Sequence, residues 1–493
     1  MKTKSLIAML ASATMLAGCN LAPDYARPTG AVPATLPEGG IYPAAATDAP
    51  DITRIGWRDF FLDPRLRQVI ETGLANNRDL RIAAGNVLQA RAQLRVQRGA
   101  LVPTTAVTGS GTYTNNVFGA AGAGAGGGTG AGGAGGGGVG TGAGVGAASS
   151  SDLEIYSVNA GFSAFELDLF GRVRNLSRAA QEQVFASEEA QRATRISLIA
   201  EIATAWLTLA SDQEQLRVAR DTLKTFQQTL NLTTAQFRIG VGSELEVRQA
   251  ETNYQAARND IATLETRVAQ DQNALNLLVG TTVTADQLPA ALGKEAVTRD
   301  ALPANVSSEV LLRRPDVLQA EHQLIAENAN IGAARAAFFP TISLTATVGT
   351  ISTALSSLFS GGSFTYNAAP GLSLPLFDGG QRQGNLEYAR ASQAVAVATY
   401  ERSIQTAFRE VADALAQRGT IDEQVDAQTA RAVAASTAAR LSNARFRAGI
   451  DSFLTTLDAQ RTAYAAEQQL VTTRLNQANN LVELYRSLGG GLN

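Results

Sequence analysis

The sequence predicts a membrane protein of the α+β class, in which very long helices alternate with pairs of short strands. Three observations lead to this prediction. Apolar residues recur at helical spacing over a stretch of nearly seventy residues that contains no proline. Two other stretches, residues 99–151 and 336–377, carry no charged side chain. The same order of segments occurs twice along the chain, which predicts a duplicated unit.

The longest helix is expected between Gly171 and about Ile239. It would be about 100 Å long, because an α-helix rises about 1.5 Å per residue. A counterpart is expected from about Arg382 to Arg447. The apolar residues of the first helix are spaced as in a coiled coil: Ile196, Ile199, Ala203, Trp206, Leu209, Leu216, Leu223, Phe226, Leu230 and Phe237.

Each long helix is expected to turn back in a tight hairpin. The helices end at Gly240 and Gly449, since glycine readily adopts the left-handed conformation that terminates helices. Ser243 and Ser452 then begin the return helices as N-cap residues. The return helices are shorter, so other segments must complete the helical length. The further helices are expected at residues 243–279, 452–488, 64–100 and 307–337.

The charge-free stretches are expected to form transmembrane strands, with half-buried strands of a soluble protein as the alternative. Apolar and polar side chains alternate, as in strands that face lipid on one side and a lumen on the other. In one strand Tyr156, Val158, Ala160 and Phe162 would oppose Ser157, Asn159, Gly161 and Ser163; in another, Ile342, Leu344 and Val348 would oppose Thr341, Ser343 and Thr347.

Four strands cannot close a barrel, because transmembrane barrels need about eight or more strands and lipid does not tolerate open sheet edges. Several chains must therefore share one barrel. Two chains would give about eight strands and three would give about twelve, and the pattern does not choose between them.

The first twenty residues are typical of a bacterial export signal. Lys2 and Lys4 precede a short apolar stretch, residues 5–16, which is too short to remain as a membrane-spanning helix. The stretch ends in Leu-Ala-Gly-Cys at residues 16–19, which resembles a lipobox, in which the cysteine is acylated and becomes the new N-terminus. Residues 1–18 would then be the signal peptide and Cys19 the lipid attachment site; an ordinary signal with an incidental cysteine is the alternative.

Because Asn20 follows, and not the Asp of an inner-membrane retention signal, we expect delivery to the outer membrane of a Gram-negative cell. Acyl chains on Cys19 would anchor the protein without making it span the bilayer.

The composition argues against an enzyme and against a metal or nucleic-acid site. The net charge is −3, so nucleic acid is an unfavourable partner. Cys19 and His322 are the only Cys and His, which excludes a disulfide within the chain, a His/Cys metal cluster and a nucleophile–His dyad. His322 lies in a helical pattern and is interpreted as an ordinary helix residue. We expect no cofactor apart from the covalent lipid on Cys19.

A glycine-rich run occupies the first copy of the repeat between Gly119 and Gly146. Asp79 corresponds to Asp316 at an offset of 237, whereas Phe237 corresponds to Phe446 at an offset of 209. The first copy therefore holds about thirty extra residues, and the glycine run has about that length. It is expected to be an insertion in the loop between the first two strands, either as a flexible fringe or without function.

These features divide the chain into four parts. They are the signal peptide (1–18), an acylated extended segment (19–63), a first repeat (64–290) and a second repeat (291–493). The first repeat has strands at 103–116 and 156–170, an external loop at 119–151 and a tip near 240–243. The second repeat has strands at 340–351 and 364–377 and a tip near 449–452.

Several motifs together resemble the TolC/OprM outer-membrane factors, and the start of the mature chain, CNLAPDYARP, is similar to their NodT-like lipoprotein branch. The motifs are FELDLFGRVRN (165–175), PLFDGGQRQGN (375–385), LLRRPDV (311–317), FRIGVGSELEV (237–247) and FRAGIDSFLTTLDAQ (446–460). The resemblance implies a homotrimer with one shared twelve-stranded barrel that continues as a tube of periplasmic helices. It also implies the exit duct of a tripartite efflux pump, with a periplasmic adaptor and an inner-membrane transporter, of the RND type, as partners.

The resemblance also implies site residues. Family members dock the adaptor through both hairpin turns, at positions that match Arg238, Gly240, Ser243, Leu245, Arg447, Gly449, Ser452 and Leu454. Some members close the periplasmic end with an aspartate pair; Asp458 matches one aspartate, and Thr455 stands where the other would be. A three-fold ring of Asp458 could bind a cation or select charge. An ordinary exposed helix residue is the alternative interpretation.

Two other functions remain open at this point, a duct for type I protein secretion and a trimeric surface adhesin. An adhesin would usually carry its barrel at one end of the chain, not in two separate hairpins. The three methionines all lie in the signal and there is one histidine, so the composition favours organic compounds such as drugs over metal cargo.

Overall fold

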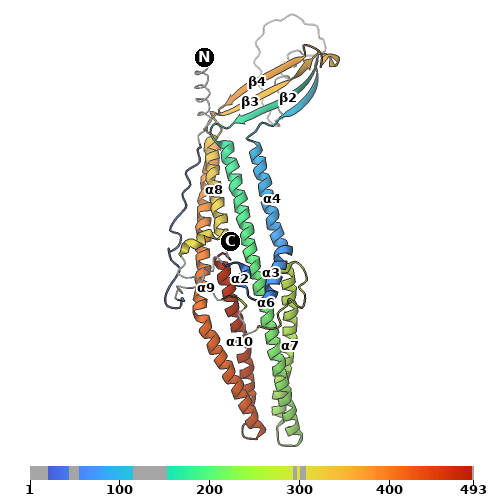
Figure 1. Cartoon of the computed structure of the whole chain (residues 1–493), viewed down its shortest axis with the longest axis vertical. Coiled ribbons are helices and arrows are strands. Elements are labelled where there is room, and N and C mark those ends of the chain that lie inside the picture. The colour runs from blue at the N-terminus through green and yellow to red at the C-terminus, as the bar shows by residue number, and fades with distance from the viewer. Residues whose placement is uncertain (1–19, 44–54, 115–152, 293–296, 300–306, 491–493) are drawn as a thin grey trace. The chain divides into compact units, whose positions relative to one another are not determined.

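The computed structural model describes residues 20–43, 55–114, 153–292, 297–299 and 307–490 (Figure 1). The chain divides into two compact units. The first unit is formed by Met1–Ala26, Ala90–Gln183 and Ile325–Val395, and the second by Arg27–Gln89, Val184–Leu324 and Ala396–Asn493. The signal, Cys19 and the glycine-rich run lie outside the described residues.

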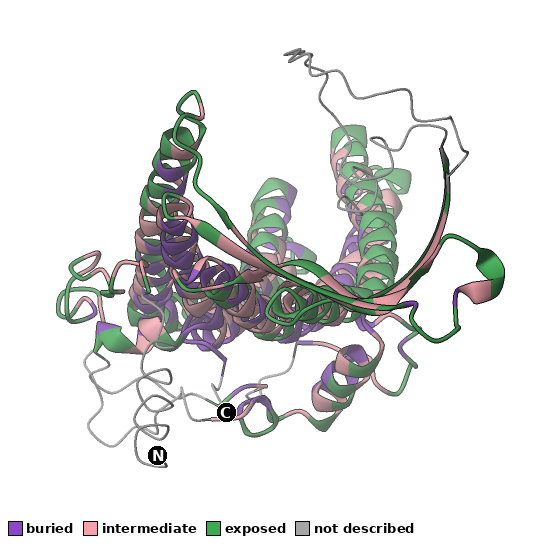
Figure 2. Cartoon of the chain, turned by 90° about the horizontal axis from the view of Figure 1, so that it is seen from above, coloured by how far each residue is buried: buried purple, intermediate pink, exposed green. Residues whose placement is uncertain are grey.

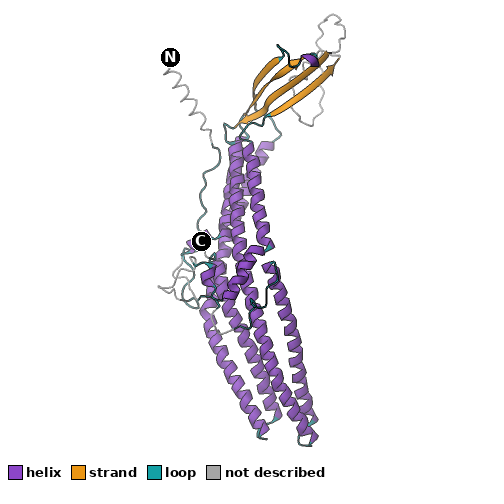
Figure 3. Cartoon of the chain, turned by 45° about the vertical axis from the view of Figure 1, so that its right-hand side comes forward, coloured by secondary structure: helices purple, strands orange, loops and turns teal. Residues whose placement is uncertain are grey.

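The first unit contains a four-stranded antiparallel sheet, drawn in orange in Figure 3. Its strands are β1 (Ala106–Thr114), β2 (Leu153–Leu167), β3 (Thr341–Ser352) and β4 (Phe364–Ser373), and they lie in the order of the sequence. β1 and β4 therefore form the two edges of the sheet. Within the described chain neither edge pairs with another strand.

The register of the sheet separates apolar from polar side chains. Val158 pairs with Thr350 and Ala160 with Val348, and Val348 in turn pairs with Tyr366. On the opposite face Ser110 pairs with Ser157 and their hydroxyls lie 2.9 Å apart. No residue of β3 or β4 is buried, which Figure 2 shows by the absence of purple along these strands. The predicted alternation is therefore seen, and no element among the described residues covers either face of the sheet.

A β-bulge interrupts the pairing of β2 with β3. Phe162 pairs with Ala346 and Phe165 with Leu344, so β2 holds one residue more than β3 at this point. Ala164 adopts a left-handed conformation, with φ of 51°. Its N–H donates to Thr345 Oγ1 at 3.0 Å, so the backbone group freed by the bulge still has a partner.

β2 and β4 end earlier than the sequence pattern suggests, because the helix that follows each of them begins with a carboxylate cap. β2 ends at Leu167, and Asp168 Oδ2 accepts the Arg174 N–H at 2.8 Å. β4 ends at Ser373, and Asp378 accepts the N–H groups of Gly380 and Arg382, both at 3.1 Å. A carboxylate near a helix N-terminus satisfies free N–H groups and complements the helix dipole.

The predicted long helices are present. α6 (Arg172–Arg238) and α9 (Gln381–Arg447) have 67 residues each, and the return helices α7 (Glu244–Val279) and α10 (Phe453–Ser487) have 36 and 35. α6 is long and apolar enough to cross a membrane by length and composition alone, but half of its most apolar window is buried inside the protein.

The segments expected to complete the helical length are each broken once. α3 (Pro64–Asn76) is separated from α4 (Arg78–Gly99) by Asn77, whose side chain accepts the Leu80 N–H at 2.9 Å and starts the next helix. A 3₁₀ helix, η2 (Ser308–Arg313), precedes α8 (Pro315–Ala336). Pro315 explains this second break, since a residue before proline avoids the helical conformation and Arg314 is extended.

The core of the second unit is centred on aromatic side chains. Phe60, in the short helix α2 (Trp57–Phe60), stacks on Tyr485 of α10 with ring centroids 4.2 Å apart. Phe61 contacts both rings edge-on, and all three side chains are buried. The short segment before α3 thus holds the end of the chain in the core.

Candidate functional site

The first hairpin tip, at the end of α6, is built from a glycine turn and a capping box. Gly240 has φ of 81°, and its N–H donates to the Phe237 carbonyl at 3.0 Å. Ser243 Oγ accepts the Glu246 N–H at 3.3 Å, and Glu246 Oε2 accepts the Ser243 N–H at 3.0 Å. Two free N–H groups at the start of α7 are thereby satisfied.

The second tip, at the end of α9, repeats the glycine turn with a different cap. Gly449 has φ of 74°, and its N–H donates to the Phe446 carbonyl at 2.9 Å. Ser452 Oγ accepts the Thr455 N–H at 3.3 Å and lies 2.9 Å from the Thr455 hydroxyl.

An ion pair between Arg445 and Asp451 links the two sides of the second tip. Arg445 Nε donates to Asp451 Oδ2 at 2.9 Å, and this contact lowers the pKa of the Asp451 carboxyl. The carboxylate therefore stays charged, and the bond is kept, at any pH near neutral.

The tips expose aliphatic side chains. Leu245 and Leu454, both expected site residues, are 66% and 64% exposed. Three further aliphatic residues beside the glycines are exposed and were not among the expected site residues: Ile239, Val241 and Ile450. The sequence does contain a signal for these three residues. Tight turns usually carry polar residues, so aliphatic residues in a turn indicate a surface that another protein can cover.

The two tips belong to one packed region of the second unit. Ala250 of α7 packs with Phe446 and Phe453 of the second hairpin, and Leu230 of α6 lies against the same cluster. Buried polar contacts reinforce it, since Gln460 Nε2 donates to Thr229 Oγ1 at 3.0 Å. The structure therefore brings the expected docking residues of both tips onto one end of this unit.

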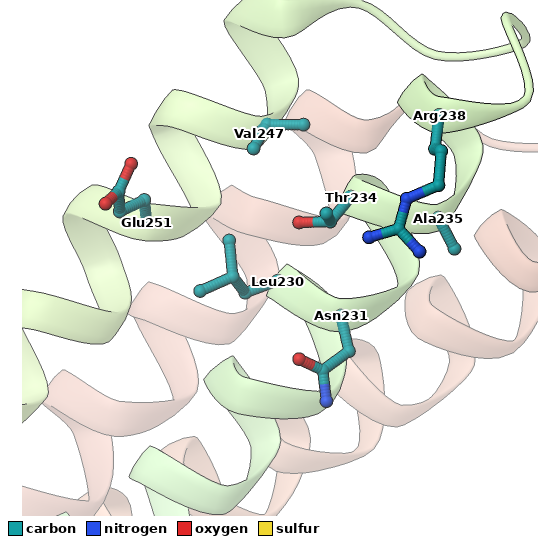
Figure 4. A pocket seen from close by; sticks show the side chains of 7 residues that line it. All are labelled: Leu230, Asn231, Thr234, Ala235, Arg238, Val247 and Glu251. Carbon is teal, nitrogen blue, oxygen red and sulfur yellow. The ribbon is translucent and has the colours of Figure 1, made fainter.

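A groove lies between α6 and α7 just behind the first tip (Figure 4). Arg238, an expected docking residue, lies in its wall and its side chain is directed back over Thr234 and Asn231. The residues that line the groove are Leu230, Asn231, Thr234, Ala235, Arg238, Val247 and Glu251. The groove therefore combines three apolar and two uncharged polar side chains with one basic and one acidic side chain.

Asp458 and Thr455 lie one turn apart on α10, and both are exposed. No cation of the described chain is paired with Asp458. Thr455 uses its N–H and hydroxyl in the cap of α10, which gives it a structural role.

His322 is half-buried against the Phe185 ring, with centroids 5.3 Å apart. Within the described residues no group of three or more His, Cys, Asp or Glu side chains could hold a metal ion.

Known proteins resemble this chain over its whole length. The family model described as outer membrane efflux protein matches residues 69–281 and 306–490. The toluene efflux pump outer membrane protein TtgC of Pseudomonas putida is 43% identical over 496 residues, with 99% of this chain and 96% of the relative covered. The cation efflux system protein CusC of Escherichia coli is 37% identical over 484 residues, with 97% and 98% covered.

A solved structure agrees with these relatives. The open state of the MtrE outer membrane channel of Neisseria gonorrhoeae matches with a TM-score of 0.81 and 36% identity, with 96% of this chain and 99% of that chain covered. A duct in the outer membrane fits the helical hairpins and the uncovered sheet described above. The chain belongs to the outer membrane efflux protein family and serves as an outer-membrane exit duct of an efflux system.

Proposed function

We propose that three copies of this chain form one duct that passively conducts small toxic organic compounds from a periplasmic adaptor and an inner-membrane transporter, of the RND type, to the exterior. The observation that carries the proposal is the sheet with two open edges, one apolar face and one polar face. Open edges in lipid must be paired, and the edges available are β1 of one copy and β4 of the next.

Three copies would join their sheets into a barrel of about twelve strands, which is above the minimum of about eight. The face with Ser110, Ser157 and Asn159 would line the lumen, and the face with Val158 and Tyr366 would contact lipid. A polar, uncharged wall suits a conduit that does not bind its cargo tightly.

The choice of organic cargo rests on the relatives and the composition together. The more similar of the two relatives is named for toluene efflux and the other for cation efflux. A metal duct would be expected to carry soft ligands, but this chain has one His and three Met, all three in residues 1–15. The passive duct would have no catalytic residue and no cofactor besides a lipid on Cys19.

The tips are proposed to dock the adaptor. Exposed aliphatic residues at two neighbouring glycine turns form a surface that another protein could cover, and the Arg238 groove adds a basic contact. Ser243 and Ser452 cap helices, so their own contribution would be to shape the tip. Contacts would come from Leu245, Leu454, Arg238 and Arg447, which are all exposed.

Photo-crosslinking in living cells tests the proposal. A photoreactive residue at Ser243 should capture a periplasmic adaptor, and the adaptor's type would identify the pump. Ser356, an exposed serine in the β3–β4 connection, is the matched control and should capture no periplasmic protein. Failure to capture any periplasmic partner, in a protein that is trimeric in the outer membrane, would favour a structural role at the cell surface.

A separate experiment tests the proposed gate. If Asp458 forms a charged ring in the trimer, Asp458→Ala should raise single-channel conductance and weaken block by multivalent cations, because a ring of like charges binds cations. The neighbouring Asp451→Ala variant, which removes a paired carboxylate, is the control. Unchanged conductance and unchanged block in Asp458→Ala would eliminate the gate.

A further inference from the structure

Residues 20–43, here called the strap, contain no helix; they are mostly extended up to Gly30 and end in a turn at residues 39–42. In the first unit, side chains of α8 donate to carbonyl groups of the strap. Arg335 Nη1 donates to the Leu21 carbonyl at 3.1 Å, and Asn328 Nδ2 donates to the Pro23 carbonyl at 2.7 Å. The strap therefore begins next to the last turn of α8, close to the start of β3.

In the second unit an ion pair continues this series. Arg27 Nε and Nη2 donate to the two carboxylate oxygens of Glu321 at 2.8 and 2.6 Å. The Glu321 side chain is only 8% exposed, whereas the Arg27 side chain is 45% exposed, so the carboxylate is shielded from water and the guanidinium is only partly covered. Tyr400 is fully buried near this ion pair. Burial raises the pKa of the Tyr400 hydroxyl, the Glu321 charge raises it further, and the Arg27 charge lowers it.

The spacing of these contacts fits an extended peptide antiparallel to a helix. From Leu21 to Arg27 an extended chain covers about 20 Å, at about 3.3 Å per residue. From Arg335 back to Glu321 the helix covers about 21 Å, at about 1.5 Å per residue. The two overall lengths agree to within about 1 Å.

Beyond Arg27 the strap is held by main-chain contacts with other elements of the second unit. The Ala34 carbonyl accepts the Ser308 N–H at 3.0 Å, and Thr35 forms a β-bridge with Ser307. The Ala31 carbonyl accepts Gln405 Nε2 at 3.4 Å. Recognition of carbonyl groups is independent of side-chain identity, so these contacts depend on the course of the main chain and not on its side chains.

Glycines provide the space in which the strap lies. A methyl group added at Gly419 of α9 would lie 1.6 Å from the Ile41 carbonyl oxygen, and the nearest atoms within 4 Å of it all belong to the strap. A methyl group at Gly332 of α8 would lie 2.7 Å from Asn175 Nδ2, outside the strap, and 2.8 Å from Ala22 of the strap. Both glycines lie inside helices, where glycine is less favourable than alanine; close approach of the strap accounts for Gly419, and at Gly332 the strap shares the space with Asn175.

We propose that α8 and α9 carry a binding site for an extended peptide with one arginine, and that the chain's own strap occupies this site. The site holds the N-terminal end of the mature chain in place independently of any acyl chain on Cys19. It holds Leu21 and Pro23 against the second half of α8. The strap is therefore a second, protein-based anchor.

The test cuts the strap from the folded full-length protein. A protease site is inserted between Pro43 and Ile55, and a C-terminal tag holds the cleaved protein on a resin during long washes with detergent. A lipopeptide held only by acyl chains moves into the passing micelles, whereas one held by the site stays. Mass spectrometry of the retained fragment over time gives its rate of loss.

Two glycines of the same helix provide a matched pair. Gly419→Ala should release the fragment at least about tenfold faster than the wild type, although it raises the helix propensity of α9. Gly384→Ala adds the same methyl group to α9 where nothing lies within 4 Å, and should retain the fragment. Comparison of uncut variants by size-exclusion chromatography confirms that assembly is intact.

The ion pair provides a second readout. Glu321→Gln should also speed release, and the charge-exchanged double variant Arg27→Glu with Glu321→Arg should restore retention. Glu71→Gln, which breaks the exposed Arg58–Glu71 pair, should behave as the wild type. Loss of the wild-type fragment as fast as from Gly419→Ala and Glu321→Gln would overturn the proposal, and it would leave the proposed efflux function untouched.

Discussion

At the scale of single residues, Arg314 joins three elements that are distant in sequence. Its guanidinium donates to Asp316 Oδ2 at 2.7 Å, to Glu410 Oε2 at 2.9 Å and to the Ser487 carbonyl at 2.6 Å. The side chain is only 5% exposed. The start of α8 is thus tied to α9 and to the last residue of α10. The buried positive charge is balanced by two carboxylates and one carbonyl group.

Replacing Arg314 should destabilise the second unit. Arg314→Met would leave the Glu410 carboxylate with Arg486 alone, at 3.4 Å, and the Ser487 carbonyl without its donor. Breaking a buried ion pair costs about 3 to 5 kcal/mol, so the melting temperature followed by circular dichroism at 222 nm should fall clearly. Arg58→Gln, at an exposed pair worth about 0 to 1 kcal/mol, should melt like the wild type. Equal melting of both variants would contradict this account.

A second prediction concerns pH. Burial and the neighbouring Asp212 carboxylate raise the pKa of Asp271 to about 6. An aspartate in the unfolded chain has a pKa of about 3.9, so between these values the folded state binds the proton more tightly. The stabilisation is complete below about pH 4 and is lost as the pH rises through about 6.

The melting temperature should therefore decrease between about pH 4 and pH 7 in the wild type. Asp271→Asn, which cannot ionise, should decrease less over this range, and at pH 7 it should melt higher than the wild type. Asp286→Asn, at an exposed position, is the control and should keep the wild-type slope. An unchanged slope in Asp271→Asn would show that the pair carries no proton.

At the scale of elements, the two hairpins reach similar lengths with different caps. α7 starts with a reciprocal capping box at Ser243 and Glu246, whereas α10 starts with Ser452 and Thr455. Both tips keep a glycine with positive φ, which alanine would occupy only at a cost of about 1 kcal/mol. The tips are thus held by local bonds, and their aliphatic residues stay free for contact with a partner.

Removal of a cap should loosen a tip without unfolding the helices. Ser243→Ala loses the hydroxyl of the capping box, worth about 1 kcal/mol. Amide hydrogen exchange at residues 244–247 should become several-fold faster, while the global melting temperature stays the same because the core lies elsewhere. Ser403→Ala, within α9, should not change exchange at this tip. Unaltered exchange in Ser243→Ala would mean that packing alone fixes the turn.

At the scale of the whole molecule, the glycine-rich run is expected to be dispensable. The pairing of β1 with β2 is set by their own residues, from Ala106↔Gly161 to Thr114↔Leu153, and not by the length of the connection. Removing residues 119–146 should therefore leave trimer formation and export unchanged, measured by heat-modifiable mobility and by dye efflux from cells. Loss of trimers after this deletion would assign the run a role in assembly.

The sequence by itself determined the elements with local signals. The helix ends at Gly240 and Gly449 and the N-caps at Ser243 and Ser452 are encoded within a few residues, because glycine conformation and serine capping act locally. The two faces of the strands were likewise visible, since side chains alternate with a period of two. The positions of the two tips and most of their exposed residues could also be inferred from the sequence. The exceptions are Ile239, Val241 and Ile450.

The tertiary structure alone decided what depends on residues far apart in the chain. Arg314 meets Glu410 and Ser487, which are 96 and 173 positions away, and Arg27 meets Glu321 at a separation of 294. The bulge at Ala164 depends on the register with β3, and the break at Asn77 on contact with Leu278, whose carbonyl accepts its side chain at 2.8 Å. No local pattern encodes such pairings, because their free energy exists only when the chain has brought the partners together.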